Sequence, residues 1–325
     1  MATCASAGFK VLLITDHSGT TPVETSTFSP LESIHPGVSS LLKKIDAAGV
    51  ELEATRALYT GIYAGNNYSP LGEDENGPWQ GMHIDRSIFD VQLVNAIKNK
   101  DVDVQLNEKV ESLLIEENRV VGIKTGSAEI FASYIVDASG KKGFAGKQLN
   151  FKRRFFSPLL HCWTGVSEYK GTFPLDTHAA HFIPGVDGWT WLAPQPPGHC
   201  AWTRLSLKGE ASLLPPAELK DGTIVGKIQF ANMRWRMFRP VCTEGIVLCG
   251  DAAGILDPAA GQGIFNALWS GIEAANTVVR CLQQFDYEGV HLAYYDDWFV
   301  QQFEMKVNTL KAYYEEQGIK VKSEK

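Results

Sequence analysis

The sequence predicts an α/β fold, and three stretches carry that prediction. Residues 245–282 combine a short apolar run, a loop of small residues and an amphipathic pattern, which indicates strand, tight loop and helix. Residues 2–15 indicate a short helix, a glycine turn at Gly8 and an apolar strand. Residues 102–140 alternate apolar strands with a polar turn at 116–118. Helices and strands alternating in this way are typical of α/β domains.

The front of the chain matches the second half of a nucleotide-binding βαβ unit. Helix, turn and strand follow one another over residues 2–15, without the preceding strand and the glycine-rich turn that would hold a pyrophosphate. We therefore expect that roughly 15–20 residues, the usual span of that strand and turn, are missing upstream. The alternative is that Met1 is the true start and residues 2–7 form a short tail before an edge strand.

Helical patterns recur further along the chain. Residues 39–49 and 83–100 have the apolar spacing of amphipathic helices, and 295–318 predicts a long helix with aromatic residues at helical spacing. We expect that last helix to pack over a sheet, with a partner surface as the alternative.

Length, charge and cysteine content exclude several classes of protein. With 325 residues, 44% of them hydrophobic, the chain is long enough for one large or two moderate domains. Its net charge of -7 argues against nucleic acid or an anionic membrane as partner, and no apolar run reaches the ~20 residues of a membrane span. Six scattered cysteines without a CxxC motif or a signal peptide favour the cytoplasm.

Two local clusters, one basic and one of histidines, do not match a functional motif. The basic run "FKRRFF" at 151–156 fits a solvated strand edge or loop better than a track for phosphates. The two histidines of "HAAH" at 178–181 lack the glutamate and third ligand of a zinc site, so we expect no metal.

Four segments together resemble flavoprotein monooxygenases of the para-hydroxybenzoate hydroxylase fold, in particular their halogenase-like branch. They are "AGFKVLLIT" (7–15), "DRSIFDVQL" with "IVDASG" (85–93 and 135–140), "GWTWLAP" (188–194) and "GIVLCGDAAGILDPAAGQGIFNAL" (245–268). The resemblance implies a Rossmann-like FAD-binding domain, truncated at its N-terminus, with a mixed β-sheet substrate domain and C-terminal helices. It divides the chain into 1–150 with 241–285 for FAD, 151–240 for substrate, and 286–325 as a helical tail.

The same resemblance assigns cofactor contacts. Asp251 of the Gly250–Asp251 pair would accept hydrogen bonds from the ribityl chain of FAD, while the helix that begins near Ile264 would direct its positive end at the flavin. Arg86 would face the phosphates or the ribityl chain, although an arginine at a helix start is as often a plain surface residue. The expected FAD contacts are Asp16 (adenosine ribose), Arg86, Gly250, Asp251, Pro258, Gly261, Gln262 and Gly263.

The tryptophan-rich middle of the chain would bind substrate. Trp189 and Trp191 match the Trp-x-Trp motif of halogenases, and strand alternation places both on one face, where they would wall a pocket or simply fill a core. Tyr63 lies in the stretch that carries the halogenase lysine, yet no lysine occurs at 45–97. An arginine cannot replace that amine, so oxygen insertion is favoured over halogenation. His161 and His35 are acid–base candidates, with a structural role as the alternative.

A narrower resemblance is to the flavoproteins that build tryptophan-derived quinone cofactors. It implies an aromatic substrate, either a small molecule or a tryptophan side chain on a partner protein, and an external electron donor such as NAD(P)H or a flavin reductase. The alternative from another class is a non-catalytic chain that has lost flavin and serves as an interaction module.

Overall fold

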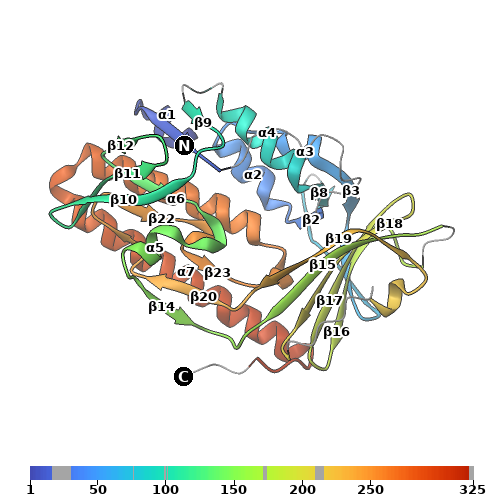
Figure 1. Ribbon diagram of the computed structural model, residues 1–325. Coiled ribbons are helices and arrows are strands. Elements are labelled where there is room, and N and C mark those ends of the chain that lie inside the picture. The colour runs from blue at the N-terminus through green and yellow to red at the C-terminus, as the bar shows by residue number, and fades with distance from the viewer. Residues whose placement is uncertain are drawn as a thin grey trace.

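The computed structural model describes residues 1–16, 31–75, 77–98, 100, 102–170, 174–208 and 216–321. Helices and small sheets gather at one end of the molecule, a large sheet forms the other end, and the last helix runs beneath both (Figure 1). The expected α/β class, with a mixed sheet and C-terminal helices, is confirmed.

The front of the chain folds as the sequence predicts. Helix α1 (Ala2–Ser6) is followed by Gly8 at φ +83°, and strand β1 (Val11–Ile14) then pairs in parallel with β9 (Val102–Gln105). Glycine is suited to that turn because a left-handed φ carries no steric cost without a Cβ.

Two sets of parallel strands stay separate in this end of the molecule. One is β1–β9; in the other, β13 (Ile135–Asp137) pairs in parallel with β22 (Ile246–Leu248), which also pairs with β21 (Cys242–Thr243). Among the described residues β1 and β13 each have a single strand partner, and Leu12 and Val136 are 37% and 39% exposed.

A three-stranded antiparallel sheet stands beside these strands. It contains β10 (Val110–Glu116), β11 (Arg119–Thr125) and β12 (Glu129–Phe131). Glu117 and Asn118 take left-handed conformations between the first two strands, so the predicted polar turn is confirmed. The chain then forms the short helices η1 (Gly140–Lys142) and α5 (Phe144–Gln148).

The large sheet has seven strands in the order β19-β15-β18-β17-β16-β4-β5. All neighbours are antiparallel except β16 and β4, which makes the sheet mixed, as predicted. Two strands come from residues 61–70, outside the 151–240 range expected for this sheet, because β4 pairs in parallel with β16. The strands are β4 (Gly61–Ala64), β5 (Asn67–Pro70), β15 (His161–Glu168), β16 (Ala179–Gly185), β17 (Gly188–Gln195), β18 (His199–Ser206) and β19 (Thr223–Asn232).

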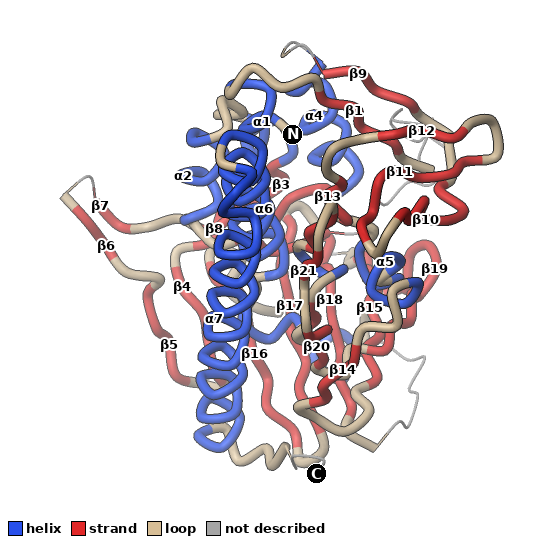
Figure 2. The backbone as a smooth tube through the Cα atoms, turned by 90° about the vertical axis from the view of Figure 1, so that its left-hand side faces the viewer, coloured by secondary structure: helices blue, strands red, loops and turns tan. Residues whose placement is uncertain are grey.

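Helices cover the junction between the two ends. Helix α6 (Gly263–Gln283) and the longer α7 (Glu288–Glu316) lie side by side (Figure 2). The tail helix packs on the large sheet, as predicted: the ring of Tyr313 meets Phe182 of β16 edge-on at 5.2 Å. Helices α2 (Gly37–Lys44), α3 (Val50–Ala54) and α4 (Arg86–Lys98) surround the small sheet β2 (Leu31–Ile34), β8 (Gly81–Asp85) and β3 (Thr55–Tyr59).

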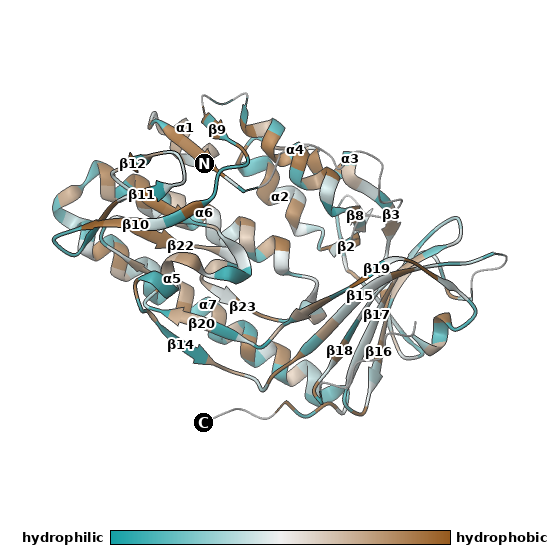
Figure 3. Cartoon of the chain, viewed as in Figure 1, coloured by the Kyte–Doolittle hydropathy of each residue, from teal (hydrophilic) through white to brown (hydrophobic). Residues whose placement is uncertain are grey.

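The remaining elements are short. A ribbon of β14 (Lys152–Phe155), β20 (Arg236–Arg239) and β23 (Gly254–Ile255) connects the two ends, and β6 (Glu73–Asp74) pairs with β7 (Gly77–Pro78). In Figure 3 the strand β22 is coloured as hydrophobic and β14 as hydrophilic, which matches the buried and exposed positions of these strands. None of the helices in the described part of the chain is both long and apolar enough to cross a bilayer.

Gly245, which precedes β22, lies where the backbone closely approaches the backbone of Val120 in β11. It has φ +80°, and a Cβ at this position would stand 1.9 Å from the carbonyl oxygen of Val120. We expect Gly245→Ala to lower the free energy of unfolding, measured in urea, by about 2 kcal/mol or more. Gly271→Ala is the matched control: it lies inside α6 with open space around its Cβ, so alanine should stabilise by about 1 kcal/mol. Unchanged stability of Gly245→Ala would contradict the close approach.

Candidate functional site

The segment between β22 and α6 is a chain of tight turns held against the helix. Gly250 begins the short helix η3 (Gly250–Ala252) at φ +56°, and its N–H donates to Ser270 Oγ of α6 at 2.8 Å. A second short helix, η4 (Pro258–Ala260), ends at Gly261 with φ +58°. The strand–loop–helix order predicted for residues 245–282 is therefore observed.

The start of α6 leaves its first backbone donors for a ligand. Gln262 is the N-cap residue of the helix, which begins at Gly263, and none of the described side chains caps it. Uncapped N–H groups and the helix dipole together favour a negatively charged or carbonyl-bearing ligand at this end. Gly261 lies against β2, since a Cβ there would be 3.6 Å from the carbonyl oxygen of Ser33.

Asp251 and Arg86 come together although they are far apart in the sequence. Burial raises the pKa of Asp251, the cations Lys141, Arg86 and Arg236 oppose that rise, and Glu32 adds to it. The guanidinium of Arg86 pairs with Glu32 at 3.0 Å and with Asp90 at 2.7 Å. The half-buried Asp251 carboxylate thus has both positively and negatively charged neighbours. Hydroxyl groups of a ligand could donate the hydrogen bonds that a carboxylate in this position needs.

Asp16 contacts the short helix η1, whose Lys141 lines a hollow together with Asp251. It follows β1 and pairs with Lys142 Nζ of η1 at 2.9 Å, and both side chains are largely exposed. A ribose hydroxyl there would compete with Lys142 for the carboxylate.

A buried hydrogen-bond network stands directly before the Pro258 turn. Asp257 accepts from Trp235 Nε1 at 2.6 Å, from Tyr314 Oη at 2.8 Å and from the N–H of Ala259 at 3.0 Å. Trp189, only 2% exposed, donates its Nε1 to Tyr314 Oη. The network joins the large sheet, α7 and the turn before α6, so it fixes the turn relative to the sheet.

Trp191 belongs to a different chain of contacts. Its Nε1 donates to Ser33 Oγ at 3.0 Å, and that hydroxyl lies 2.9 Å from Nδ1 of His83. The ring of His83 stacks on Tyr59 at 4.6 Å, and burial lowers the pKa of His83 to about 3. Nε2 of His83 has no hydrogen-bond partner among the described residues. Trp189 and Trp191 share a face of β17, as alternation predicts, but they bond in different directions, and their role as a pocket wall stays a prediction.

The other catalytic candidates are held by ring contacts. Tyr63 stacks on His181 at 5.2 Å within the large sheet. His161, at the start of β15, contacts Phe230 at 5.6 Å and Trp163 at 6.0 Å, and its Nδ1 is buried without a described partner. His35 accepts from the N–H of Gly37 through Nδ1 at 3.0 Å, which is a local turn contact.

Four further site residues escaped the sequence pattern: Ser33, His83, Asp257 and Tyr314. Asp257 stood next to the predicted Pro258, and a polar residue between apolar runs ahead of a proline is an available signal for a helix N-cap. Ser33, His83 and Tyr314 come from distant segments, so only the folded chain brings them to the site. Within the described residues, no three His, Cys, Asp or Glu side chains gather as a metal site.

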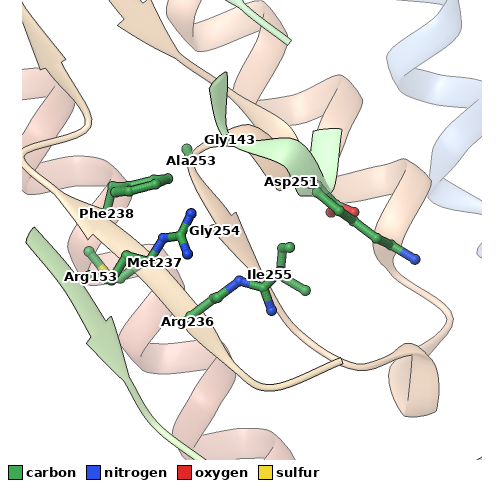
Figure 4. Close-up of a pocket in the computed structure, with 10 residues that line it drawn as sticks. Gly143, Arg153, Arg236, Met237, Phe238, Asp251, Ala253, Gly254 and Ile255 are labelled. Carbon is green, nitrogen blue, oxygen red and sulfur yellow. The ribbon is translucent and has the colours of Figure 1, made fainter. Parts of the chain in front are cut away.

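A small hollow opens beside Asp251 (Figure 4). About 10 Å³ of it is accessible to the centre of a water molecule, which is room for a single water. Its charged lining residues are Lys141, Arg153, Arg236 and Asp251.

Comparisons with known proteins agree on the fold. No protein-family model matches the chain. The digeranylgeranylglycerophospholipid reductase 1 of Methanococcoides burtonii is 24% identical over 247 residues, 66% of this chain and 57% of that protein. The reductase 3 of Methanosphaera stadtmanae is 25% identical over 294 residues, 82% and 70% of the two chains. The chain thus spans little more than half the length of the first relative.

Solved structures resemble the chain over nearly its whole length. The myxobacterial chondrochloren halogenase CndH has a TM-score of 0.79 at 19% identity, covering 96% of this chain and 78% of its own. A geranylgeranyl bacteriochlorophyll reductase-like protein of Thermoplasma acidophilum has 0.75 at 20%, covering 94% and 81%. The peptidyl tryptophan dihydroxylase QhpG has 0.69 at 19%, covering 94% and 70%. The predicted fold is confirmed, whereas the halogenase-like branch is one of several that share it.

Titration of Asp257 gives a stability test. Burial raises the pKa of Asp257 from 3.8 to about 6, against the hydrogen bonds it accepts. Because the pKa of Asp257 is higher in the folded than in the unfolded chain, its contribution to the free energy of unfolding is complete below about pH 4. That contribution is lost as the pH rises through 6, by up to about 3 kcal/mol. Asp257→Asn cannot titrate, so the wild type should lose that much relative to the variant between about pH 4 and 7 in urea unfolding. A difference independent of pH would contradict the raised pKa; the exposed Asp286→Asn is the control.

Proposed function

We propose that the chain binds FAD along residues 249–263 and acts as a flavin-dependent oxidoreductase. The observation that carries this proposal is the meeting of distant segments at β2: the turn before α6 approaches the carbonyl oxygen of Ser33, and Arg86 pairs with the neighbouring Glu32. Both Arg86 and Glu32 also act on the pKa of Asp251. Asp251, Arg86 and the start of α6 each have a partner on the cofactor: hydroxyls for the carboxylate, phosphate for the guanidinium, and the flavin carbonyls for the N–H groups. The flavin-dependent and FAD-dependent names of the halogenases that share the fold support the same cofactor.

Each part of the site has a distinct task in this proposal. Asp251 binds and orients the ribityl chain, and the first N–H groups of α6 stabilise negative charge on the flavin ring. Gly261 and Gly263 leave space for the ring to approach the backbone. When bound, the flavin would transfer electrons between a reductant and the substrate or oxygen. The Asp257 network holds the Pro258 turn in place and keeps water out beneath it.

For the substrate, we propose an aromatic group and oxygen insertion rather than halogenation. Residues 45–97 contain no lysine, and Arg56 in that stretch is occupied by an ion pair with Asp85 at 3.1 Å. The similarity of fold to QhpG, a peptidyl tryptophan dihydroxylase, supports a tryptophan side chain on a partner protein as one form of this substrate. An external donor such as NAD(P)H or a flavin reductase would supply the electrons.

A second candidate is reduction of an apolar substrate. The curated relatives named above are reductases of digeranylgeranylglycerophospholipid, and they match this chain by sequence. Both candidates need the same bound flavin and differ in whether oxygen takes part.

Flavin binding is the first test. The purified chain mixed with excess FAD should keep a flavin absorption spectrum through gel filtration. Asp251→Ala should bind FAD about tenfold more weakly or worse, because charge-assisted hydrogen bonds contribute about 1.5–3 kcal/mol. Asp286→Ala, an exposed carboxylate near the far end of α6, should bind like the wild type. A wild-type chain that stays colourless would refute the cofactor, and leave the interaction module as the alternative function.

The type of reaction is the second test. The FAD-loaded chain is incubated with oxygen, a flavin reductase, NADH, bromide and a tryptophan-containing peptide. The masses of the products are measured by mass spectrometry. We expect a peptide one oxygen atom heavier and no brominated peptide, because the chain lacks the lysine amine. A brominated product would contradict the assignment. In a parallel incubation with a prenyl-chain substrate and without oxygen, saturation of that chain would favour the reductase.

A further inference from the structure

The arginines of the β14–β20 ribbon divide between its two faces. Arg153 stands opposite Phe238 in the register, and Phe155 opposite Arg236. Side chains two residues apart share a face, so Arg153 and Arg236 are diagonal neighbours on one face of the ribbon. Lys152, Arg154 and Arg239 lie on the other.

Only one of those faces has acidic partners. Arg154 pairs with Glu304 at 2.8 Å, and Arg239 lies 3.9 Å from both Asp296 and Asp297, all on α7. On the opposite face Arg153 packs over the ring of Phe238 at 4.8 Å, while Arg236 donates to the carbonyl oxygen of Arg234 at 3.0 Å. Neither has an ion pair among the described residues.

This unpaired face borders the hollow beside Asp251. Three cations, Lys141, Arg153 and Arg236, line the hollow together with that single carboxylate. Figure 4 shows the two guanidinium groups next to each other, with Asp251 apart from them. Burial and the neighbouring Arg153 lower the pKa of Arg236, and Asp251 only partly offsets them. The fold therefore holds two like charges close together without neutralising them.

We propose that Arg153 and Arg236 form an oxyanion subsite that binds a phosphate group of a small phosphorylated ligand. Guanidinium groups present paired donors that match phosphate oxygens, and two of them at one hollow would exchange mutual repulsion for charge-assisted hydrogen bonds. The hollow is the size of one water, so the phosphate would enter from its open side. Binding of a phosphate group at this subsite can be measured without FAD. The phosphate belongs either to the diphosphate of FAD or to a second ligand.

The test is calorimetric titration of the full chain with inorganic pyrophosphate, in a low-salt buffer free of phosphate and sulfate. Wild-type protein should show saturable binding, weakened about tenfold or more in Arg153→Gln and Arg236→Gln, because each loses a charged donor. Arg154→Gln is the matched control, since it removes an equal charge from the acid-paired face. Thermal melting checks that all variants are folded, and the exposed Arg153 keeps the test valid if Arg236→Gln is unstable.

Several outcomes would overturn the subsite. They are no binding to the wild type, unchanged binding to both variants, or an equal loss in Arg154→Gln, which would indicate only general charge attraction. A repeat with saturating FAD separates the two sources. Loss of pyrophosphate binding assigns the subsite to the diphosphate of FAD, and persistence assigns it to a second phosphorylated ligand. Pyrophosphate binding by a chain that refuses FAD would support the subsite while refuting the proposed function.

Discussion

The carboxylate of Asp257 is the constraint on which the site depends. A buried carboxylate is tolerated only when donors surround it, and here the donors are Trp235, Tyr314 and the backbone of Ala259. These donors come from the segment between β19 and β20, from α7 and from the turn before α6. The hydrogen bonds that the buried Asp257 carboxylate needs therefore fix three segments relative to each other, and they set the position of the Pro258 turn.

The turn in its own right determines where α6 begins. Gly250 and Gly261 adopt left-handed conformations that let the chain reverse twice within a short span, and Ser270 ties the first reversal to the helix. The helix then starts without a capping side chain, facing β2 at Ser33. A ligand with hydroxyl and carbonyl groups would be a natural complement to the Asp251 carboxylate and to the first N–H groups of this helix.

Local patterns allowed the fold to be predicted from sequence, and long-range contacts limited the prediction of the site. Strand, loop and helix at 245–282 were predictable because small residues and apolar periodicity act over a few positions. The Trp189 and Trp191 alternation gave their shared face, but their partners Tyr314 and Ser33 lie far away in the sequence. The strands at 61–70 joined the large sheet through β16, a parallel pairing that no local signal specifies.

The net charge of the chain likewise does not predict where individual charged side chains lie. The net charge of -7 and the short run at 151–156 suggested a solvated strand edge, and β14 is indeed exposed. Strand alternation nevertheless separates the arginines of β14 and β20 between two faces, so that α7 pairs with one face while Arg153 and Arg236 border the hollow. A single strand can thus serve as a solvated edge and as the wall of a charged site. Average composition argues against partners that need an extended basic surface, but it does not argue against a phosphate held by two side chains.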